Sequence, residues 1–497
     1  MTRTPPVPQD VQAASAAAPE RLGARAVLIL LALVWPAQLF MLAGILTSVS
    51  AASIAQHYHT TQIAWFTLVY ALGGALFTPF VTRAGDVFGR KRVLVAVIGA
   101  GLLGDILQAS ASSYEVMLAG RLVASLYLPV TALVVSAVRD LFPPRHVGTA
   151  TGAIGAAMGA VIVLGPLLGG QLLDRFGFRA VLWTIVAGVA LALLLAVTLV
   201  PELPGTGERA GFDWAGGLTL GGAAAMLSSA LGIGGTAGWT SGPFQGTLYI
   251  GILLTVLFVL VERRAARPLL DVRLLARRDL GTVLAATAVG QGAAWTGGTL
   301  IIYLALYPRI PGVSDGLGWS ATHQALVIMP CGLVFLLAGL LAGRLAGRAD
   351  PRLPWLCGLL LAACGLVAQA YFHADEVQVI LAGVPSYLGA GMVMACSPIL
   401  LMSVVDRSAQ GVASGMQLTA ANLVTTLSTQ CMFLALAVGG TVLKGTAFYR
   451  DSGYRAAYLT LAAFMAVALL LSLLIPRIRP ASEITAGPTP HGPEPVV

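Results

Sequence analysis

The chain has 497 residues, of which 57% are hydrophobic and only 10% are charged, whereas a soluble protein averages about 25% charged residues. Its mean hydropathy of +0.85 and the recurrence of apolar runs of about 20 residues indicate an integral membrane protein and exclude one large soluble core. The net charge of +8 does not indicate nucleic-acid binding, because the basic residues lie in short gaps between the apolar runs.

Fourteen apolar runs are long enough to cross a bilayer as helices. They cover residues 25–50, 62–82, 93–111, 115–138, 148–171, 179–200, 214–234, 246–262, 281–308, 321–343, 354–372, 378–404, 411–437 and 454–475. Polar segments precede the first run and follow the last. The sequence therefore predicts an all-α integral membrane protein with fourteen transmembrane helices.

Lysine and arginine residues are unevenly shared between the alternate gaps. With both termini placed in the cytoplasm, 22 of the 29 lie in cytoplasmic segments, six lie outside, and Arg121 lies within a run. Basic residues between spans stay on the cytoplasmic side. This bias predicts a multi-pass protein of the cell membrane with both termini cytoplasmic. It also favours the count of fourteen, because the loss of one span would scramble the alternation.

A short charged turn, Thr82–Arg92, separates the second and third runs. A fainter copy, Gly343–Arg348, begins 261 residues after Thr82 and follows the tenth run. A repeated cytoplasmic turn indicates a duplicated helix bundle, which is how many transporters are built. In a plain six-plus-six repeat the two turns would be six runs apart, but they are eight apart. Two additional helices, 214–234 and 246–262, must therefore lie between the halves.

The turn resembles the cytoplasmic signature of the major facilitator superfamily, Gly-x-x-x-Asp-(Arg/Lys)-x-Gly-Arg-(Arg/Lys). The matching residues are Asp86, Gly89, Arg90 and Lys91, whereas Thr82 and Val87 depart from the signature. Glycine permits a tight turn, and the basic residues can pair with acids at neighbouring helix ends. The resemblance implies a cluster that latches the two halves together in the outward-open state, and Arg139 and Asp140 are placed to take part. Alternatively, the basic residues only fix the topology.

The fifth run resembles the antiporter motif of the same superfamily, Gly-x8-Gly-x3-Gly-Pro-x2-Gly-Gly. The matching residues are Gly152, Gly165, Pro166, Gly169 and Gly170, and Val161 replaces the middle glycine. The family associates this motif with exporters, but small residues also let helices approach closely, so a close-packed helix face is the alternative. The segments Phe212–Gly216, Pro268–Asp271 and Gly411–Gly415 add a resemblance to the fourteen-span drug:proton antiporter branch.

The resemblance implies the major facilitator fold, in which two six-helix bundles are here joined by two linker helices. The expected units are a disordered cytoplasmic tail (1–24), an N-terminal six-helix bundle (25–200), a linker with two extra transmembrane helices (201–280), a C-terminal six-helix bundle (281–475) and a second disordered cytoplasmic tail (476–497).

The resemblance further implies a secondary active exporter of hydrophobic or amphipathic small molecules, of the drug or antibiotic type, that works by alternating access against proton entry. A lipid or glycolipid exporter and an uncoupled transporter on the same fold are the alternatives. An enzyme is not expected, because the sequence shows no nucleophile–base spacing or metal-ligand cluster. The expected partners are the lipid bilayer, the small-molecule substrate and protons. No cofactor or nucleic acid is expected, and the chain is expected to be a monomer.

Ionisable residues within a membrane are costly, so each one is a functional hypothesis. Arg121 matches the superfamily's fourth-span arginine, which faces the central cavity and is linked to proton coupling. Asp105 is the acid placed well inside a predicted run, and counting from the turn after the third run brings it opposite residue 120. We therefore predict an Asp105–Arg121 ion pair, which serves in proton coupling or alternatively only holds the hairpin. Ala43 stands where the branch usually carries a first-span acid.

The walls of the central path can be sketched from the runs that line it in the superfamily. The candidate substrate-cavity residues are Gln38, Tyr127, Gln291, Trp295, Tyr303, Tyr387 and Met392. Aromatic and methionine side chains suit varied apolar ligands, because they give contact area without strict geometry. The alternative role for each is a helix–helix hydrogen bond or core packing.

Overall fold

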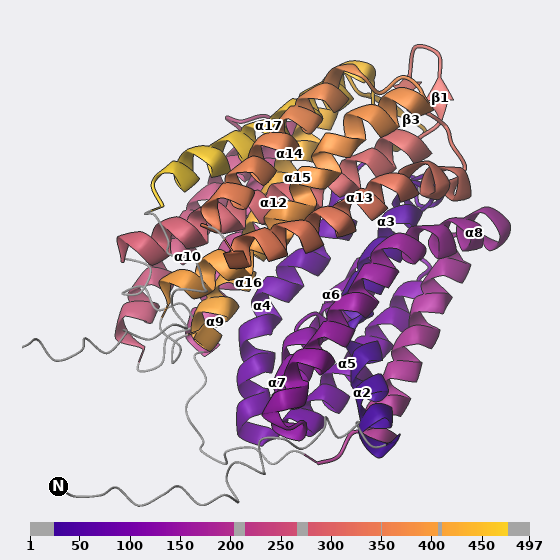
Figure 1. The fold of residues 1–497 in the computed structure, drawn as a ribbon. Coiled ribbons are helices and arrows are strands. Elements are labelled where there is room, and N and C mark those ends of the chain that lie inside the picture. Colours follow the sequence, from indigo (N-terminus) through magenta and orange to yellow (C-terminus); the bar gives the residue numbers. More distant parts are fainter. Residues whose placement is uncertain (1–23, 203–213, 266–276, 349, 406–409, 476–497) are drawn as a thin grey trace, which may run out of the picture.

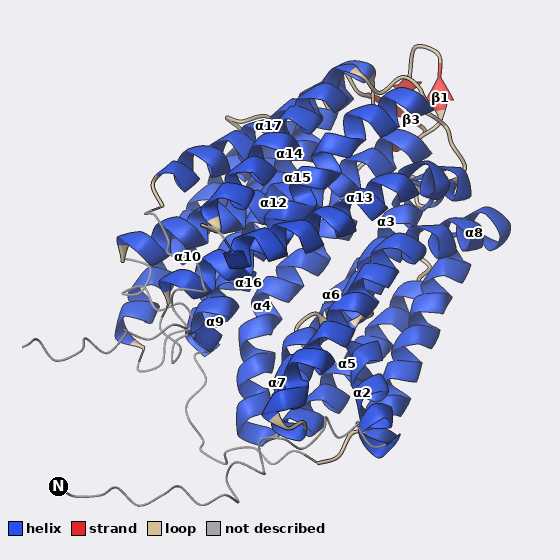
Figure 2. Cartoon of the chain, viewed as in Figure 1, coloured by secondary structure: helices blue, strands red, loops and turns tan. Residues whose placement is uncertain are grey.

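The computed structural model describes residues 24–202, 214–265, 277–348, 350–405 and 410–475, and these are almost entirely helical (Figures 1 and 2). The N-terminal half contains α2 (Ala24–Ala37), α3 (Leu39–His57), α4 (Ala64–Phe88), α5 (Arg90–Ser110), α6 (Tyr114–Ala124), the 3-10 helix η1 (Ser125–Tyr127), α7 (Val130–Leu141) and α8 (Pro144–Leu199). Two helices follow, α9 (Trp214–Ala237) and α10 (Gly242–Arg264). The C-terminal half contains α12 (Arg278–Leu306), α13 (Ala321–Arg348), α14 (Arg352–Tyr371), α15 (Glu376–Val404), α16 (Gln410–Leu436) and α17 (Asp451–Leu473).

The helices follow the predicted runs closely, with two departures. The fifth and sixth runs share the label α8 but form two helices, as predicted, because the backbone at Gly177 is not helical (φ +78°). The first departure is span one, which is divided at Gln38 into α2 and α3. Span four is divided into α6, η1 and α7, because Pro129 has no N–H to continue the helical hydrogen bonds. The terminal tails predicted to be disordered lie outside the described residues, apart from Ala24.

Eleven segments of the described chain are long and apolar enough to cross a membrane. One of them, Thr149–Thr198, includes both predicted runs of α8. The helices α12 and α16 coincide with predicted runs but are not among the eleven. The fold is therefore that of an all-α, multi-pass membrane protein, while the full count of fourteen spans stays a prediction.

The same close helix crossing occurs once in each half. On α5, a Cβ built on Gly104 would lie only 2.7 Å from the carbonyl oxygen of Gly120 on α6. On α14, a Cβ built on Gly365 would meet the backbone of Ser386 on α15. Gly104 and Gly365 are separated by the same 261 residues that separate the two charged turns. Glycine is needed at both places because two backbones approach there, and the matching offset supports a repeat of the two halves.

The helix α9 packs against both halves, through α4 on one side and α16 on the other. Its contact with α4 is close, since a Cβ built on Gly221 would lie 2.6 Å from the Leu76 side chain. The extra helix α9 is therefore packed against the bundle rather than separated from it, and α10 packs on α9.

Two short hairpins occupy the loops before α13 and before α17, and the sequence did not predict them. Strand β1 (Arg309–Ile310) pairs antiparallel with β2 (Ser314–Asp315), and β3 (Thr441–Leu443) pairs with β4 (Thr446–Phe448). The loops also bond to each other, because the Thr441 hydroxyl donates to the Val313 carbonyl at 3.3 Å. Figure 1 places β1 and β3 at one end of the molecule, the end predicted to be extracellular.

Candidate functional site

The side chain of Arg121 leaves α6 just before span four is interrupted, and it reaches α3 and α4. Its Nη2 donates to the hydroxyl of Thr47 at 2.8 Å, and its Nε donates to the carbonyl of Phe66 at 3.2 Å. The guanidinium carbon lies 4.0 Å from the ring centroid of Tyr70 and 4.7 Å from that of Phe66. Arg121 is only 3% exposed. Its charge is therefore held by aromatic faces and neutral acceptors.

Asp105 on α5 is also buried, at 2% exposure. Its Oδ1 accepts a long hydrogen bond, 3.4 Å, from the hydroxyl of Tyr127, and its Oδ2 has no hydrogen-bond partner within the described part of the chain. The ring of Tyr127 meets that of Tyr70 edge-on, with 6.4 Å between centroids. A chain of contacts therefore runs from Asp105 through Tyr127 and Tyr70 to Arg121.

The predicted direct ion pair between Asp105 and Arg121 is wrong, because the described residues form no such pair and Arg121 bonds elsewhere. The hairpin register behind the prediction is correct, since Gly104 and Gly120 face each other across it. Arg121 is one residue further on, which turns its side chain by about 100° around the helix. That rotation directs the guanidinium toward α3 and α4 instead of α5.

A cavity of about 180 Å³ lies between the two halves. The N-terminal half contributes α3 and α8 to its wall, through residues such as Ser48 and Pro166. The C-terminal half supplies the larger part, from α12, α13, α14, α15 and α17. A cavity shared by both halves is where a molecule would contact each of them at once.

Two of the predicted cavity residues, Trp295 and Tyr387, line this cavity. Trp295 on α12 also stacks on Phe40 of α3, with 5.7 Å between ring centroids and 19° between planes, so it joins the two halves. Gln38, Tyr127, Gln291, Tyr303 and Met392 do not line it. Gln38, for example, donates to the carbonyl of Val34 at 2.9 Å.

The glycines of the antiporter-type motif form close helix contacts. A Cβ on Gly169 would lie 2.9 Å from Leu46 of α3, and a Cβ on Gly170 would lie 2.6 Å from the carbonyl oxygen of Ala321 on α13. A Cβ on Gly165 would be 3.3 Å from the Ile45 side chain, whereas a Cβ on Gly152 would have nothing within 4 Å. Gly165 and Gly169 therefore pack α8 against α3, and Gly170 packs it against the other half.

Asp174 continues this contact between the halves. Its Oδ1 accepts from the backbone N–H of Ala321 at 2.9 Å, and its Oδ2 accepts from that of Thr322 at 2.7 Å. These N–H groups begin α13 and have no partner within that helix. An acid of the N-terminal half thus caps a helix of the C-terminal half at the end predicted to be extracellular.

The charged turn lies between α4 and α5. Gly89 has φ of +93°, which confirms that the turn needs a glycine. Arg90 forms an ion pair with Asp140, and Lys91 lies 3.8 Å from Glu202. Arg90, Lys91 and Asp140 belong to the N-terminal half, and Glu202 directly follows its last helix. Arg139 is exposed, and the Asp86 side chain lies outside the described residues.

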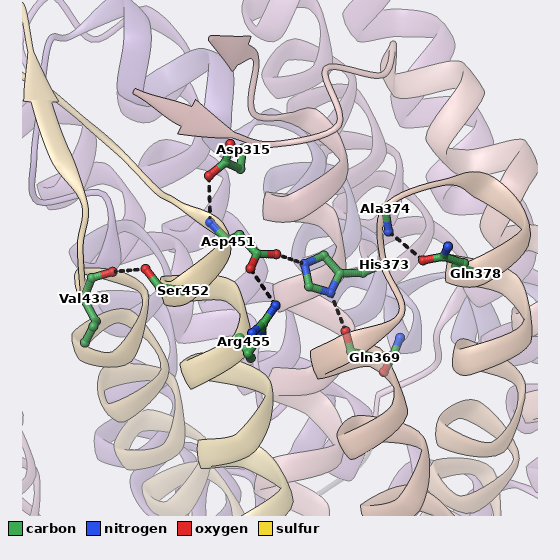
Figure 3. Close-up of polar contacts among 9 residues, drawn as sticks. All are labelled: Asp315, Gln369, His373, Ala374, Gln378, Val438, Asp451, Ser452 and Arg455. Carbon is green, nitrogen blue, oxygen red and sulfur yellow. Dashed lines mark hydrogen bonds and ion pairs between the residues drawn. The ribbon is translucent and has the colours of Figure 1, made fainter. Parts of the chain in front are cut away.

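A polar network joins the outer ends of α14 and α17 (Figure 3). The two ring nitrogens of His373 contact the Gln369 carbonyl at 2.7 Å and the Asp451 carboxylate at 3.0 Å. Asp451 also pairs with Arg455 at 2.8 Å, and its backbone N–H donates to Asp315 at 3.0 Å. Gln369 lines the cavity, so this network holds the backbone of one wall residue.

Sequence reasoning missed Asp174, Gln324 and Gln369. The last was detectable, since it is a polar residue inside a predicted apolar run. Asp174 and Gln324 gave no such signal, because both lie at run ends, where polar residues are ordinary. The role of Asp174 depends on contacts with a segment about 150 residues away, and that of Gln324 on the cavity that both halves enclose.

Comparison with known proteins agrees with this architecture. The family model described as Major Facilitator Superfamily matches residues 34–429. Multidrug resistance protein Stp of Mycobacterium tuberculosis is 27% identical over 364 residues, which are 71% of this chain and 65% of that protein. A Streptomyces coelicolor protein named "Probable actinorhodin transporter" is 29% identical over 414 residues, 79% of this chain and 67% of that protein. The chain thus spans about two thirds of the length of these relatives.

A solved structure shares the fold. It is the crystal structure of a peptide transporter, POT, in complex with sulfate, which matches with a TM-score of 0.64 at 15% identity and covers 95% of this chain and 97% of that one.

Proposed function

We propose that this chain, which belongs to the Major Facilitator Superfamily, is a secondary exporter of hydrophobic or amphipathic small molecules that works by alternating access. The observation that carries the proposal is the cavity between the halves. Next to it, Asp174 and Gly170 of α8 contact the first residues of α13. Rocking of one half against the other would open this contact and expose the cavity to the other side. The names of the relatives, a multidrug resistance protein and an actinorhodin transporter, support drug-type or antibiotic-type substrates.

Proton entry drives the cycle, and Asp105 takes up the proton. Its open Oδ2 can receive one, and its other oxygen is linked through Tyr127 and Tyr70 to Arg121. Arg121 bonds Thr47, and the next residue along α3, Ser48, lines the cavity. Neutralising Asp105 changes the electrostatic field at Arg121. Because Arg121 is bonded to Thr47, this change alters the position of α3. Asp105 would thereby replace the acid that is missing at Ala43.

The cytoplasmic cluster has a separate role in this proposal. The Arg90–Asp140 pair fastens α5 to α7 within the N-terminal half, so that half rotates as one body. Both termini are cytoplasmic, and the chain acts as a monomer in the cell membrane.

The test is transport by the purified full chain in liposomes with an imposed pH gradient, measured with a fluorescent lipophilic cation and with 2-naphthol. Wild type is expected to accumulate at least one probe, and Asp105→Asn is expected to lose gradient-driven accumulation while it retains counterflow exchange. The matched control is Glu262→Gln, which neutralises another buried acid on α10, outside the two halves. Wild-type liposomes that accumulate neither probe, or an Asp105→Asn variant that behaves like Glu262→Gln, would overturn the proposal.

A further inference from the structure

The wall of the cavity between the halves contains no carboxylate, lysine, arginine or histidine side chain among the described residues. Asp105 and Arg121, the buried charges of the N-terminal half, do not line it. A cation that enters such a site loses its hydration and gains no opposite charge in return. The wall therefore disfavours the lipophilic cations that an acidic cavity would select.

The polar groups that do face the cavity are neutral, and apart from Ser48 of α3 they come from the C-terminal half. Gln324 on α13 is 2% exposed, and its Oε1 has no hydrogen-bond partner within the described ranges. Gln369 on α14 and Tyr387 on α15 line the same cavity. A buried carboxamide oxygen without a partner is an acceptor that a ligand's donor would satisfy.

The remaining wall suits a flat ring. Trp295 presents an indole to the cavity while it stacks on Phe40, and Met329, Met394 and Met465 add flexible thioether contacts. The volume of about 180 Å³ is slightly larger than the roughly 150 Å³ of an engineered cavity that binds benzene. The cavity in this conformation thus accommodates one small ring system.

From these three features we infer that the cavity binds an uncharged planar aromatic group that carries a hydrogen-bond donor, such as a phenolic hydroxyl, and that Gln324 receives the donor. The inference rests on the proposed function, since it names the class of substrate for the same cavity. The neutral wall disfavours lipophilic cations.

Binding to the purified full chain in nanodiscs tests the inference, with three probes built on one ring system. The probes are 2-naphthol, 2-methoxynaphthalene, which lacks the donor, and trimethyl(2-naphthyl)ammonium, which is a cation. Calorimetry corrected for empty nanodiscs is expected to show 2-naphthol binding at least about tenfold more tightly than either of the others. Equal or tighter binding of the cation by the wild type would overturn the inference.

Variants of Gln324 identify the acceptor. Gln324→Leu is expected to remove the preference for 2-naphthol over the methyl ether, and Gln324→Glu to shift the preference toward the cation by about tenfold. The matched control is Gln245→Glu, the same change at an exposed site on α10, which should leave the order of affinities unchanged. The unfolding temperature shows whether the Gln324→Glu protein is folded. A folded Gln324→Glu protein that keeps the wild-type order of affinities for the three probes would also refute the assignment.

Transport separates this inference from the proposed function. If 2-naphthol binds selectively but is not moved by a pH gradient, the class of ligand stands and proton-driven export fails. If a pH gradient drives accumulation of the cation but not of 2-naphthol, export stands and the neutral class of substrate fails.

Discussion

Asp174 of the N-terminal half accepts a hydrogen bond from the backbone N–H of Thr322, the second residue of α13, with 2.7 Å between oxygen and nitrogen. Helix N-termini carry unpaired N–H groups and a partial positive charge, so they favour a carboxylate. Most helices receive this cap from a residue next to them in sequence. Here the cap comes from the other half of the molecule, so it exists only while the two outer ends are together.

Replacing Asp174 with alanine is expected to favour separation of the outer ends. A helix cap contributes about 1 kcal/mol, which corresponds to a roughly fivefold shift in the ratio of closed to open molecules. Spin labels at positions 175 and 323, in a cysteine-free background, would measure the shift by double electron–electron resonance as a larger population at long distance.

Asp375→Ala is the matched control for this experiment. Asp375 caps α15 by accepting from the backbone N–H of Gln378 at 2.9 Å, and both residues belong to the C-terminal half. Its loss weakens a helix end but does not separate the halves. An Asp174→Ala distance distribution identical to that of Asp375→Ala would contradict a closing role for Asp174.

Two glycines of the antiporter-type motif are expected to respond differently to alanine. At Gly170 the new Cβ would lie 2.6 Å from the carbonyl oxygen of Ala321, and backbone cannot move aside as a flexible side chain can. At Gly152 the new Cβ would meet nothing within 4 Å. Gly170→Ala should therefore slow transport at least about tenfold and lengthen the distance between labels 175 and 323, while Gly152→Ala should resemble wild type. Equal effects would show that the motif does not act through this contact.

The sequence predicted the helices well because membrane spans are set by local composition. Apolar runs defined the helix limits, and the 261-residue offset between the charged turns reappears in the paired crossings at Gly104 and Gly365. The Asp105–Arg121 pair failed because the direction of one side chain depends on rotation around α6, which counting along a hairpin does not fix. The Asp174 cap and the Gln324 acceptor depend on docking between the halves, for which the sequence holds no local signal.

Arginine at position 121 is expected to be irreplaceable by lysine. The guanidinium uses separate nitrogens to reach Thr47 on α3 and Phe66 on α4, and its plane lies over Tyr70. A lysine keeps the charge, but its single ammonium group lacks the separated N–H donors of the planar guanidinium. The loss of a charge-assisted hydrogen bond costs about 1.5–3 kcal/mol, so Arg121→Lys should reduce the initial rate of transport about tenfold or more.

Arg179→Lys provides the comparison for Arg121. Arg179 donates one hydrogen bond, 3.2 Å long, to the carbonyl of Ala111, and its nearest ring centroid, that of Phe178, is 5.8 Å away. A lysine can supply a single bond of this kind, so the rate should change less than about threefold. If both variants retain wild-type rates, Arg121 is a packing residue and not part of the coupling route.

The bridge between α14 and α17 is expected to stabilise the folded chain. His373 has one ring nitrogen on the Gln369 carbonyl and the other on the Asp451 carboxylate. Asp451 also pairs with Arg455, and its backbone N–H donates to Asp315 (Figure 3). His373→Asn should therefore lower the unfolding temperature by about 1–3 °C.

His323→Asn shows what an exposed pair contributes. His323 lies 2.9 Å from Glu376, but these side chains are 42% and 52% exposed, compared with 9% for His373. Solvent weakens such pairs, so His323→Asn should leave the unfolding temperature nearly unchanged. The two histidines also differ in their relation to the cavity, because Gln369 belongs to its wall. His373→Asn should accordingly weaken 2-naphthol binding, whereas His323→Asn should not. Equal effects of the two variants would mean that the bridge behind Gln369 does not shape the cavity.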